Sequence, residues 1–152
     1  MKRADNKSRC PINFSLEIFG DTWSLLIIRD MITLGKKTFG EFLDSEERIG
    51  PSVLADRLAH LEKRGLISKE PDLADKRKMI YSLTETGINA IPIVYEIAVW
   101  GSRTSSNPKA AEAWFKSMQY DKNLVLKLWR EAVESGSSFF YGPNSVVERL
   151  GL

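Results

Sequence analysis

Apolar residues in the first part of the chain recur at the spacing of amphipathic helices and are separated by short polar breaks. This pattern predicts a short helix over 12–19, behind Pro11, and a second helix over 22–34. Asp21 is the expected N-cap of the second helix and Gly35 its expected end. Because the second helix is apolar almost all round, we expect it in the middle of a core.

Two more helices are predicted directly afterwards. Thr38, with Glu41 three positions later, has the capping-box pattern and opens a short helix. Pro51 opens a further helix that runs to Arg64, where Gly65 ends it. Two helices joined by a short turn, the second better formed, are the outline of a helix-turn-helix.

Beyond residue 65 the pattern changes from helical spacing to short strands. Segments 66–69 and 79–83 are predicted to pair across the polar loop 70–78, which holds the cluster Asp75-Lys76-Arg77-Lys78. A β-hairpin with a basic tip directly after a helix-turn-helix is a wing. The sequence therefore predicts a mainly α fold of the α+β type, a winged helix-turn-helix with a β-hairpin wing.

A helical part follows the hairpin. Thr84 is the expected cap of a long dimerisation helix over 85–102, and two helices are predicted over 109–119 and 121–135. Asn144 is the expected cap of a last short turn. The chain is thus divided into a basic N-terminal arm (1–9), a winged-helix domain (10–102) and a helical C-terminal extension for dimerisation or effector binding (103–152).

Composition narrows the classes of function. A hydrophobic share of 43% and a charged share of 28% are typical of a soluble globular protein, and no apolar stretch is long enough to span a membrane. The single cysteine, Cys10, fits a reducing cytoplasm, where we expect the protein. With one histidine, no Gly-rich phosphate loop and no Cys/His group at metal spacing, we expect neither an enzyme nor a bound metal or cofactor. The net charge of +2 says little about nucleic acid.

Several motifs resemble, in the same order, those of HxlR-type regulators within the broader MarR group. They are Cys10-Pro11, the segments 20–27, 49–58 and 61–67, Tyr81-Ser82-Leu83-Thr84 with Gly87, and Pro92 with Trp100-Gly101. The resemblance covers about residues 10–101 and implies a dimeric, winged, DNA-binding protein of the cytoplasm. Two features depart from it. Asp75-Lys76-Arg77 looks like the Asp-x-Arg wing of MarR proteins rather than a proline-rich wing, and the chain after Gly101 is longer than is usual in the family.

The helix over 50–64 is the predicted recognition helix for the major groove. Ser52 and Asp56 are expected on its outward face, with His60 at the edge and three leucines, Leu54, Leu58 and Leu61, on its buried side. Asp56 is equally suited to accept a hydrogen bond from cytosine and to hold a neighbouring arginine.

The wing supplies the strongest predicted contact to DNA. Arg77, oriented by Asp75, is expected to enter a narrow minor groove. For Lys36, Lys37 and Arg57, an ordinary solvated or ion-paired surface role stays open. The full predicted DNA-binding set is Lys36, Lys37, Thr38, Pro51, Ser52, Asp56, Arg57, His60, Lys76, Arg77 and Lys78.

Specific binding of DNA needs more contact than one recognition helix gives, so we expect a homodimer on two half-sites. The long helix over 85–102 offers an apolar side for this contact, although ordinary core packing is the alternative for it. The predicted interface residues are Ile88, Ile91, Tyr95, Ala98 and Val99.

Three questions stay open at this point. Cys10 is either a sensor of oxidants or electrophiles, as in some HxlR-type proteins, or a small structural residue. Aromatic residues of the extension either line a site for a small-molecule effector or, as is more common, form core: Trp114, Phe115, Trp129 and the cluster Phe139-Phe140-Tyr141. The alternative to DNA binding is a winged-helix module that binds proteins.

Overall fold

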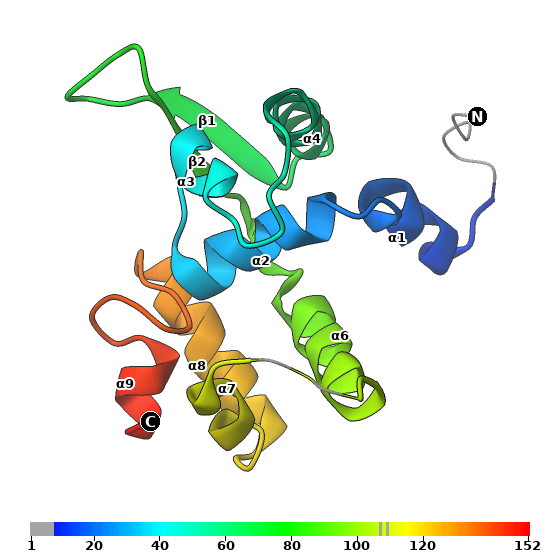
Figure 1. The fold of residues 1–152 in the computed structure, drawn as a ribbon, viewed down its shortest axis with the longest axis vertical. Helices are drawn as coiled ribbons and strands as arrows, with labels where there is room; N and C mark the ends of the chain where they lie inside the picture. Colours follow the sequence, from blue (N-terminus) through cyan, green and yellow to red (C-terminus); the bar gives the residue numbers. More distant parts are fainter. Residues whose placement is uncertain (1–7, 107, 109) are drawn as a thin grey trace.

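The fold is seen in a computed structural model that describes residues 8–106, 108 and 110–152 (Figure 1). Most of the predicted basic arm therefore lies outside the described residues. In chain order the elements are α1 (Pro11–Phe19), α2 (Ser24–Leu34), α3 (Phe39–Leu43), α4 (Pro51–Lys63), β1 (Ile67–Pro71), β2 (Met79–Leu83), α5 (Glu85–Ile88), α6 (Ile91–Thr104), α7 (Glu112–Ser117), α8 (Lys122–Glu134) and α9 (Val146–Leu150). This order confirms the predicted mainly α fold with a β-hairpin.

Helix α2 runs through the middle of the molecule, with α3, α4 and the hairpin on one side and α6 to α9 on the other (Figure 1). Ile28 and Ile32 in this helix have no exposed surface, as its all-round apolar pattern predicts. The helix begins at Ser24, two positions later than expected. The N-cap residue is therefore Trp23 and not the expected Asp21, although Asp21 Oδ1 accepts the backbone N–H groups of Trp23 and Ser24, both at 2.8 Å, in the turn that leads into the helix.

The helix-turn-helix is held by the predicted local signals. Thr38 Oγ1 accepts the backbone N–H of Glu41 at 3.3 Å, and Glu41 Oε2 accepts the backbone N–H of Thr38 at 2.8 Å, so the capping box is complete. Pro51 lies at the start of α4, where a missing N–H costs nothing. The predicted buried side of α4 is confirmed, because Leu54, Leu58 and Leu61 are at most 2% exposed.

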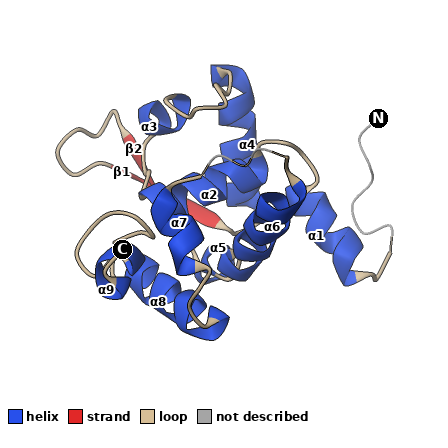
Figure 2. Ribbon diagram, turned by 60° about the horizontal axis from the view of Figure 1, so that its bottom comes forward, coloured by secondary structure: helices blue, strands red, loops and turns tan. Residues whose placement is uncertain are grey.

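The wing is an antiparallel pair in which Ile67 lies opposite Leu83 and Pro71 opposite Met79. Its second strand is tied to the helix-turn-helix, because the Tyr81 N–H donates to the carbonyl oxygen of Lys37 at 2.7 Å. The hairpin projects beyond α3 and α4, with the loop 72–78 at its tip (Figures 1 and 2).

The prediction of one long helix over 85–102 is wrong, because the structure has two helices there. Asn89 and Ala90 separate α5 from α6, and α6 continues to Thr104. Pro92 explains the break, because it has no N–H to donate to the carbonyl of Ile88 and so cannot continue the helical ladder.

Two further boundaries differ from expectation. The helix expected over 109–119 is shorter and spans α7 alone. The cap of α9 is Ser145, whose Oγ accepts the Glu148 N–H at 3.2 Å, whereas the expected cap, Asn144, lies outside the helix with a φ of 60°. A serine followed three residues later by glutamate is itself a capping signal, which explains the shift by one position.

The C-terminal extension docks onto the end of α2. Trp129 Nε1 donates to the Ile32 carbonyl at 2.8 Å, the Phe139 N–H donates to the same carbonyl at 3.0 Å, and the Phe140 N–H donates to the Thr33 carbonyl at 3.1 Å. These bonds satisfy carbonyls that the last turn of a helix leaves without intrahelical partners. Trp129 is fully buried, and its ring lies 4.9 Å from Phe139 and 6.1 Å from Trp114 between centroids. The extension is thus folded, and Trp114, Trp129 and Phe139 continue the core of the winged helix, whereas Tyr141 is exposed.

Candidate nucleic-acid interface

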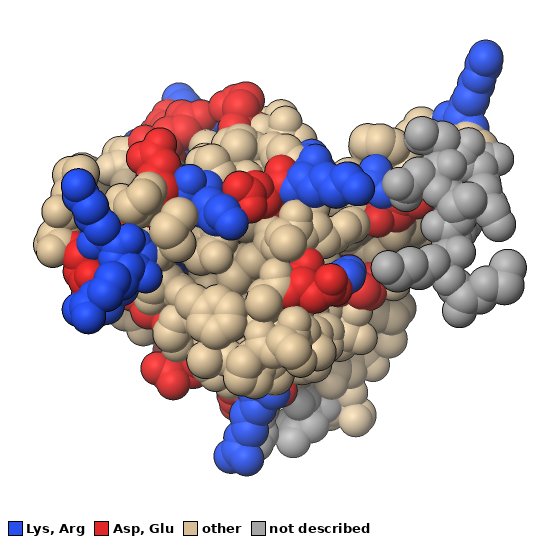
Figure 3. Space-filling model, turned by 90° about the horizontal axis from the view of Figure 1, so that it is seen from above, with Lys and Arg blue, Asp and Glu red and all other residues tan. Residues whose placement is uncertain are grey.

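The start of α4 is open to solvent. Pro51, Ser52 and Val53 are exposed in its first turn, and Asp56 is exposed one turn later. Backbone N–H groups at such a helix end can hold a phosphate. On this side of the molecule Lys and Arg side chains alternate with Asp and Glu, and the basic residues gather most densely at the edge where the wing projects (Figure 3). The surface around α4 is therefore mixed in charge.

Arg57 joins α4 to the start of α2. Its Nη2 lies 2.5 Å from Asp56 Oδ2, and its Nη1 lies 3.2 Å from Asp21 Oδ2. The bond with Asp56, together with the nearby charge of Asp21, raises the pKa of Arg57. Burial pushes the pKa of Asp21 upward, but hydrogen bonds from Ser24 and Trp23 and the charge of Arg57 outweigh it, so this pKa is lowered. Holding an arginine is one of the two roles predicted for Asp56.

Three other residues of the predicted set make contacts inside the chain. His60 Nε2 lies 3.0 Å from the carbonyl oxygen of Ile18 in α1. Thr38 caps α3, and Lys36 Nζ lies 2.9 Å from Asp30 Oδ2 with little of its side chain exposed. These contacts hold the helix-turn-helix together; a further contact to DNA stays a prediction for each.

The wing presents its cations outward. The side chain of Arg77 is 90% exposed, yet its direction is fixed, because Asp75 Oδ1 accepts from its Nε at 3.0 Å and from its backbone N–H at 3.1 Å. The same side-chain bond lowers the pKa of Asp75. Asp75 thus pairs with Arg77, and the entry of Arg77 into a minor groove stays a prediction. Lys76 and Lys78 beside it are exposed, as is Lys37, and none of these lysines forms an ion pair within the described part of the chain.

A charge cluster that the sequence did not point to anchors the turn before α4. Arg29 lies 2.6 Å from Glu47 on that turn and 2.7 Å from Asp30, whose other oxygen binds Lys36. Asp30 is 2% exposed, so its charge requires these partners. The bond from Arg29 lowers the pKa of Glu47, and the reciprocal bond raises the pKa of Arg29. The one available signal was a carboxylate within an otherwise apolar helix.

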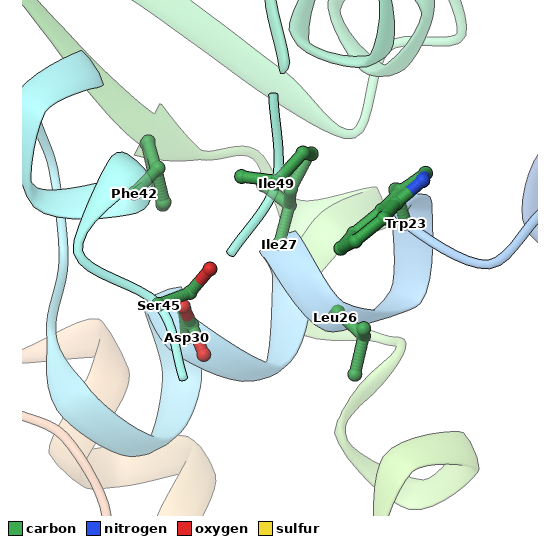
Figure 4. Close-up of a pocket in the computed structure, with 7 residues that line it drawn as sticks. All are labelled: Trp23, Leu26, Ile27, Asp30, Phe42, Ser45 and Ile49. Carbon is green, nitrogen blue, oxygen red and sulfur yellow. The ribbon is translucent and has the colours of Figure 1, made fainter. Parts of the chain in front are cut away.

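A small void lies beside Asp30 between α2 and the turn after α3 (Figure 4). Its volume is about 10 Å³, which is room for about one water molecule. The close-up shows Ile27, Phe42 and Ile49 around it. The void is therefore a packing defect rather than a ligand site.

The structure corrects the predicted dimer interface. Ile88, Ile91, Tyr95 and Val99 are at most 9% exposed, and Ala98 is half-buried, so this side of the helix packs against the chain's own core. The reason is the extension, which covers that side with α7 and α8: the Tyr95 ring, for example, packs edge-on against Trp114 at 5.6 Å.

Exposed apolar side chains lie instead on the opposite side of α6 and on α1. On α6 they are Ile93, Ile97 and Trp100, exposed by 39%, 51% and 68%, and on α1 they are Ile12, Phe14 and Leu16, each more than half exposed. Ile12 and Leu16, four residues apart, share one side of α1, whereas Phe14 lies on the other side of that helix. We therefore define the α1/α6 apolar face as Ile12, Leu16, Ile93, Ile97 and Trp100. Figures 1 and 2 both place the two helices on the same side of the molecule. Cys10, also exposed, directly precedes α1.

Neither a metal-binding cluster nor a membrane-spanning helix is found within the described residues. No group of three His, Cys, Asp or Glu side chains there is arranged to hold a metal ion. No described helix is both long and apolar enough to cross a membrane.

Residues 18–109 match the family model of HxlR-like helix-turn-helix proteins. The chain belongs to this family. It is 38% identical over 100 residues to the HTH-type transcriptional regulator YybR of Bacillus subtilis, a match that covers 63% of this chain and 76% of YybR. Among solved structures it is similar to PA1607, a candidate transcription factor, with a TM-score of 0.63, 31% identity and coverage of 70% of this chain and 72% of PA1607.

A second solved structure bears on regulation. The redox regulator HypR, in its reduced form, matches with a TM-score of 0.54 and 31% identity over 62% of this chain and 92% of HypR. The comparisons confirm the predicted family and the winged-helix fold, and they make this HxlR-like chain a transcription regulator of the helix-turn-helix type. The family match ends at residue 109, so α7, α8 and α9 of the extension lie outside it.

Proposed function

We propose that this HxlR-like regulator acts in the bacterial cytoplasm as a homodimer that binds specific double-stranded DNA, with α4 in the major groove and the wing in the minor groove. The observation that carries the proposal is the exposed Arg77, held by Asp75 at the tip of a hairpin directly behind a helix-turn-helix. A narrow minor groove concentrates negative potential and attracts arginine.

Of the remaining proposed contacts, some position the protein on the DNA backbone and others read the base sequence. Lys37, Lys76 and Lys78 are exposed cations suited to phosphates, and the start of α4 offers backbone N–H groups to another phosphate. Ser52 is the side chain best placed to meet a base edge, because it is exposed in the first turn of α4. Since this outward surface is small and partly acidic, the wing supplies much of the affinity.

A gel-shift titration with DNA from upstream of the regulator's own gene tests the proposal. Binding should weaken steeply as salt rises, because each neutralised phosphate contributes a slope of about −0.9 in log affinity against log salt. An unrelated fragment of equal length should bind at least about a thousandfold more weakly. Binding that ignores both salt and sequence would favour the alternative, a protein-binding module.

The homodimer is proposed to form through the α1/α6 apolar face. Five large exposed apolar side chains on two helices at the same side of the molecule are more than the scattered single apolar residues of an ordinary monomer surface. A charge at its centre, Ile97→Glu, should give a monomer by light scattering at micromolar concentration. Leu73→Glu, which changes the fully exposed leucine in the wing loop, is the matched control and should stay dimeric. A wild-type monomer, or a dimeric Ile97→Glu, would contradict this interface.

Redox control through Cys10 is the third part of the proposal. The cysteine is exposed at the start of α1, next to the proposed interface, and HypR is described as a redox regulator with reduced and oxidised forms. Diamide would take two electrons and two protons from two Cys10 thiols, becoming a hydrazine, and a disulfide would join two chains. We expect a linked dimer on a non-reducing gel and altered DNA affinity, both absent in Cys10→Ser. Unchanged DNA affinity of the oxidised protein would remove the sensor role.

A further inference from the structure

A cavity of about 710 Å³ opens between α2, the turn after α3, α6 and the beginning of the extension. This volume lies within the usual range for sites that bind small organic molecules. Residues before and after position 109, where the family match ends, line the cavity. The winged helix alone therefore does not form it.

One wall of the cavity is apolar and aromatic. Trp114 and Phe140 line it, with Trp129 in the same wall and Val94 and Ala98 from α6 beside them. Phe140 is half-buried, and Trp114 is 7% exposed. Such a wall suits a hydrophobic body, and aromatic faces also attract organic cations.

The opposite wall carries an excess of negative charge. Its two cations, Arg29 and Lys36, are already engaged with Asp30 inside the charge cluster described above. Asp44 and Glu46 also line the cavity, both exposed, and neither forms an ion pair or a side-chain hydrogen bond with any residue that the structure describes. The charged residues that line the cavity, three carboxylates against two cations, therefore have a net charge of −1, and two of the carboxylates line it without an ion-pair partner among the described residues.

We propose that this cavity is an effector site for amphipathic organic cations. The apolar body of such a ligand packs against Trp114 and Phe140, and its positive group lies at the carboxylates of Asp44 and Glu46. An anion of the same shape is disfavoured by the same two charges, and a neutral molecule gains nothing from them.

The two carboxylates lie close to α4, so a ligand at the cavity can affect DNA binding. This effector role rests on the proposed DNA binding. Asp44 and Glu46 lie on the turn between α3 and α4, next to Glu47, which Arg29 ties to α2. A cation bound between this turn and the extension biases the position of α4. Ligand and DNA must then change each other's affinity by the same factor.

Tetraphenylphosphonium and tetraphenylborate are a matched pair of probes, because they have the same shape and opposite charge. In isothermal titration calorimetry the full chain should bind the phosphonium at least tenfold more tightly than the borate. The double variant Asp44→Asn/Glu46→Gln should lose about thirtyfold of phosphonium affinity, because each of the two exposed charges near the ligand is worth on the order of 1 kcal/mol and about 1.4 kcal/mol corresponds to a factor of ten. Glu112→Gln removes an exposed carboxylate outside the cavity and should bind like the wild type.

Phe140→Ala should weaken both probes, because it removes part of the shared apolar wall. Equal binding of the two probes by the wild type, or unchanged phosphonium binding by the double variant, would overturn the site. Phosphonium binding that leaves the gel shift unchanged would overturn its effector role. A chain that binds phosphonium but no DNA at any salt concentration would contradict the proposed function and leave the ligand site standing.

Discussion

The half of the molecule that carries α3, α4 and the wing differs from the half built by α6 to α9 in what its side chains do. In the first half, charged residues at the surface either tie elements together, as Arg57 does, or extend into solvent, as Arg77 does. In the second half, aromatic side chains pack in the core against the end of α2, as Trp129 does. Recognition and stability are therefore assigned to different sets of residues, and mutations should separate them.

The largest effect is expected from Trp129→Ala. It removes a fully buried indole and its hydrogen bond to the Ile32 carbonyl, so the free energy of unfolding should fall by about 3–5 kcal/mol in urea denaturation. Leu124→Ala, on the exposed side of the same helix, should cost far less. A loss in Trp129→Ala as small as that in Leu124→Ala would mean that the buried indole does not stabilise the fold as proposed.

Arg77→Ala is expected to weaken DNA binding and to leave the stability of the fold almost unchanged. DNA affinity should fall by about 1–3 kcal/mol and the salt slope by about one per wing, while the stability should change by less than about 0.5 kcal/mol. Lys127→Ala removes an equal charge from α8, away from the wing, and serves as the control in the same gel shifts.

Asp75→Ala separates orientation from charge within the wing. The substitution makes the protein more positive, so a simple attraction to phosphates would strengthen binding. Because Asp75 directs the guanidinium of Arg77, we expect weaker binding instead, by about 1 kcal/mol. Stronger binding would show that only the charge of the wing matters.

The smallest effect concerns the anchor of the turn before α4. The hydrogen bond from Arg29 lowers the pKa of Glu47 below its ordinary 4.5 in the folded state, so the ion pair contributes stability above that value. This contribution is lost as the pH falls through the lowered pKa. Glu47→Gln should therefore lose on the order of 1 kcal/mol at neutral pH and approach the wild type in acid. Glu46→Gln, on the same turn, should not show this convergence in urea titrations at several pH values.

Much of the fold could be predicted because its signals are local. The capping box at Thr38, the proline at the start of α4 and the basic tip of the hairpin act within a few residues, and each appears where expected. The pairing of Asp75 with Arg77 belongs to the same class.

Two errors, the break at Pro92 and the cap at Ser145, were local signals that were missed, whereas the errors at the site arose where the answer depends on residues distant in sequence. Helix α6 is apolar on two sides, and only the packing of the extension decides that Tyr95 faces inward and Trp100 outward. The charge cluster joins Arg29 to Glu47 across 18 positions, and nothing in the spacing of single residues marks such a pair.

Because the extension docks onto the end of α2, the packed structure continues beyond the residue at which the family match ends. The family match ends at residue 109, yet the carbonyls of Ile32 and Thr33, inside the matched region, are satisfied by Trp129, Phe139 and Phe140 outside it. A fragment cut at residue 109 would expose both carbonyls and the apolar side of α6 to water. We therefore expect the two parts to melt in one cooperative transition, and the family region to be less stable without its neighbour.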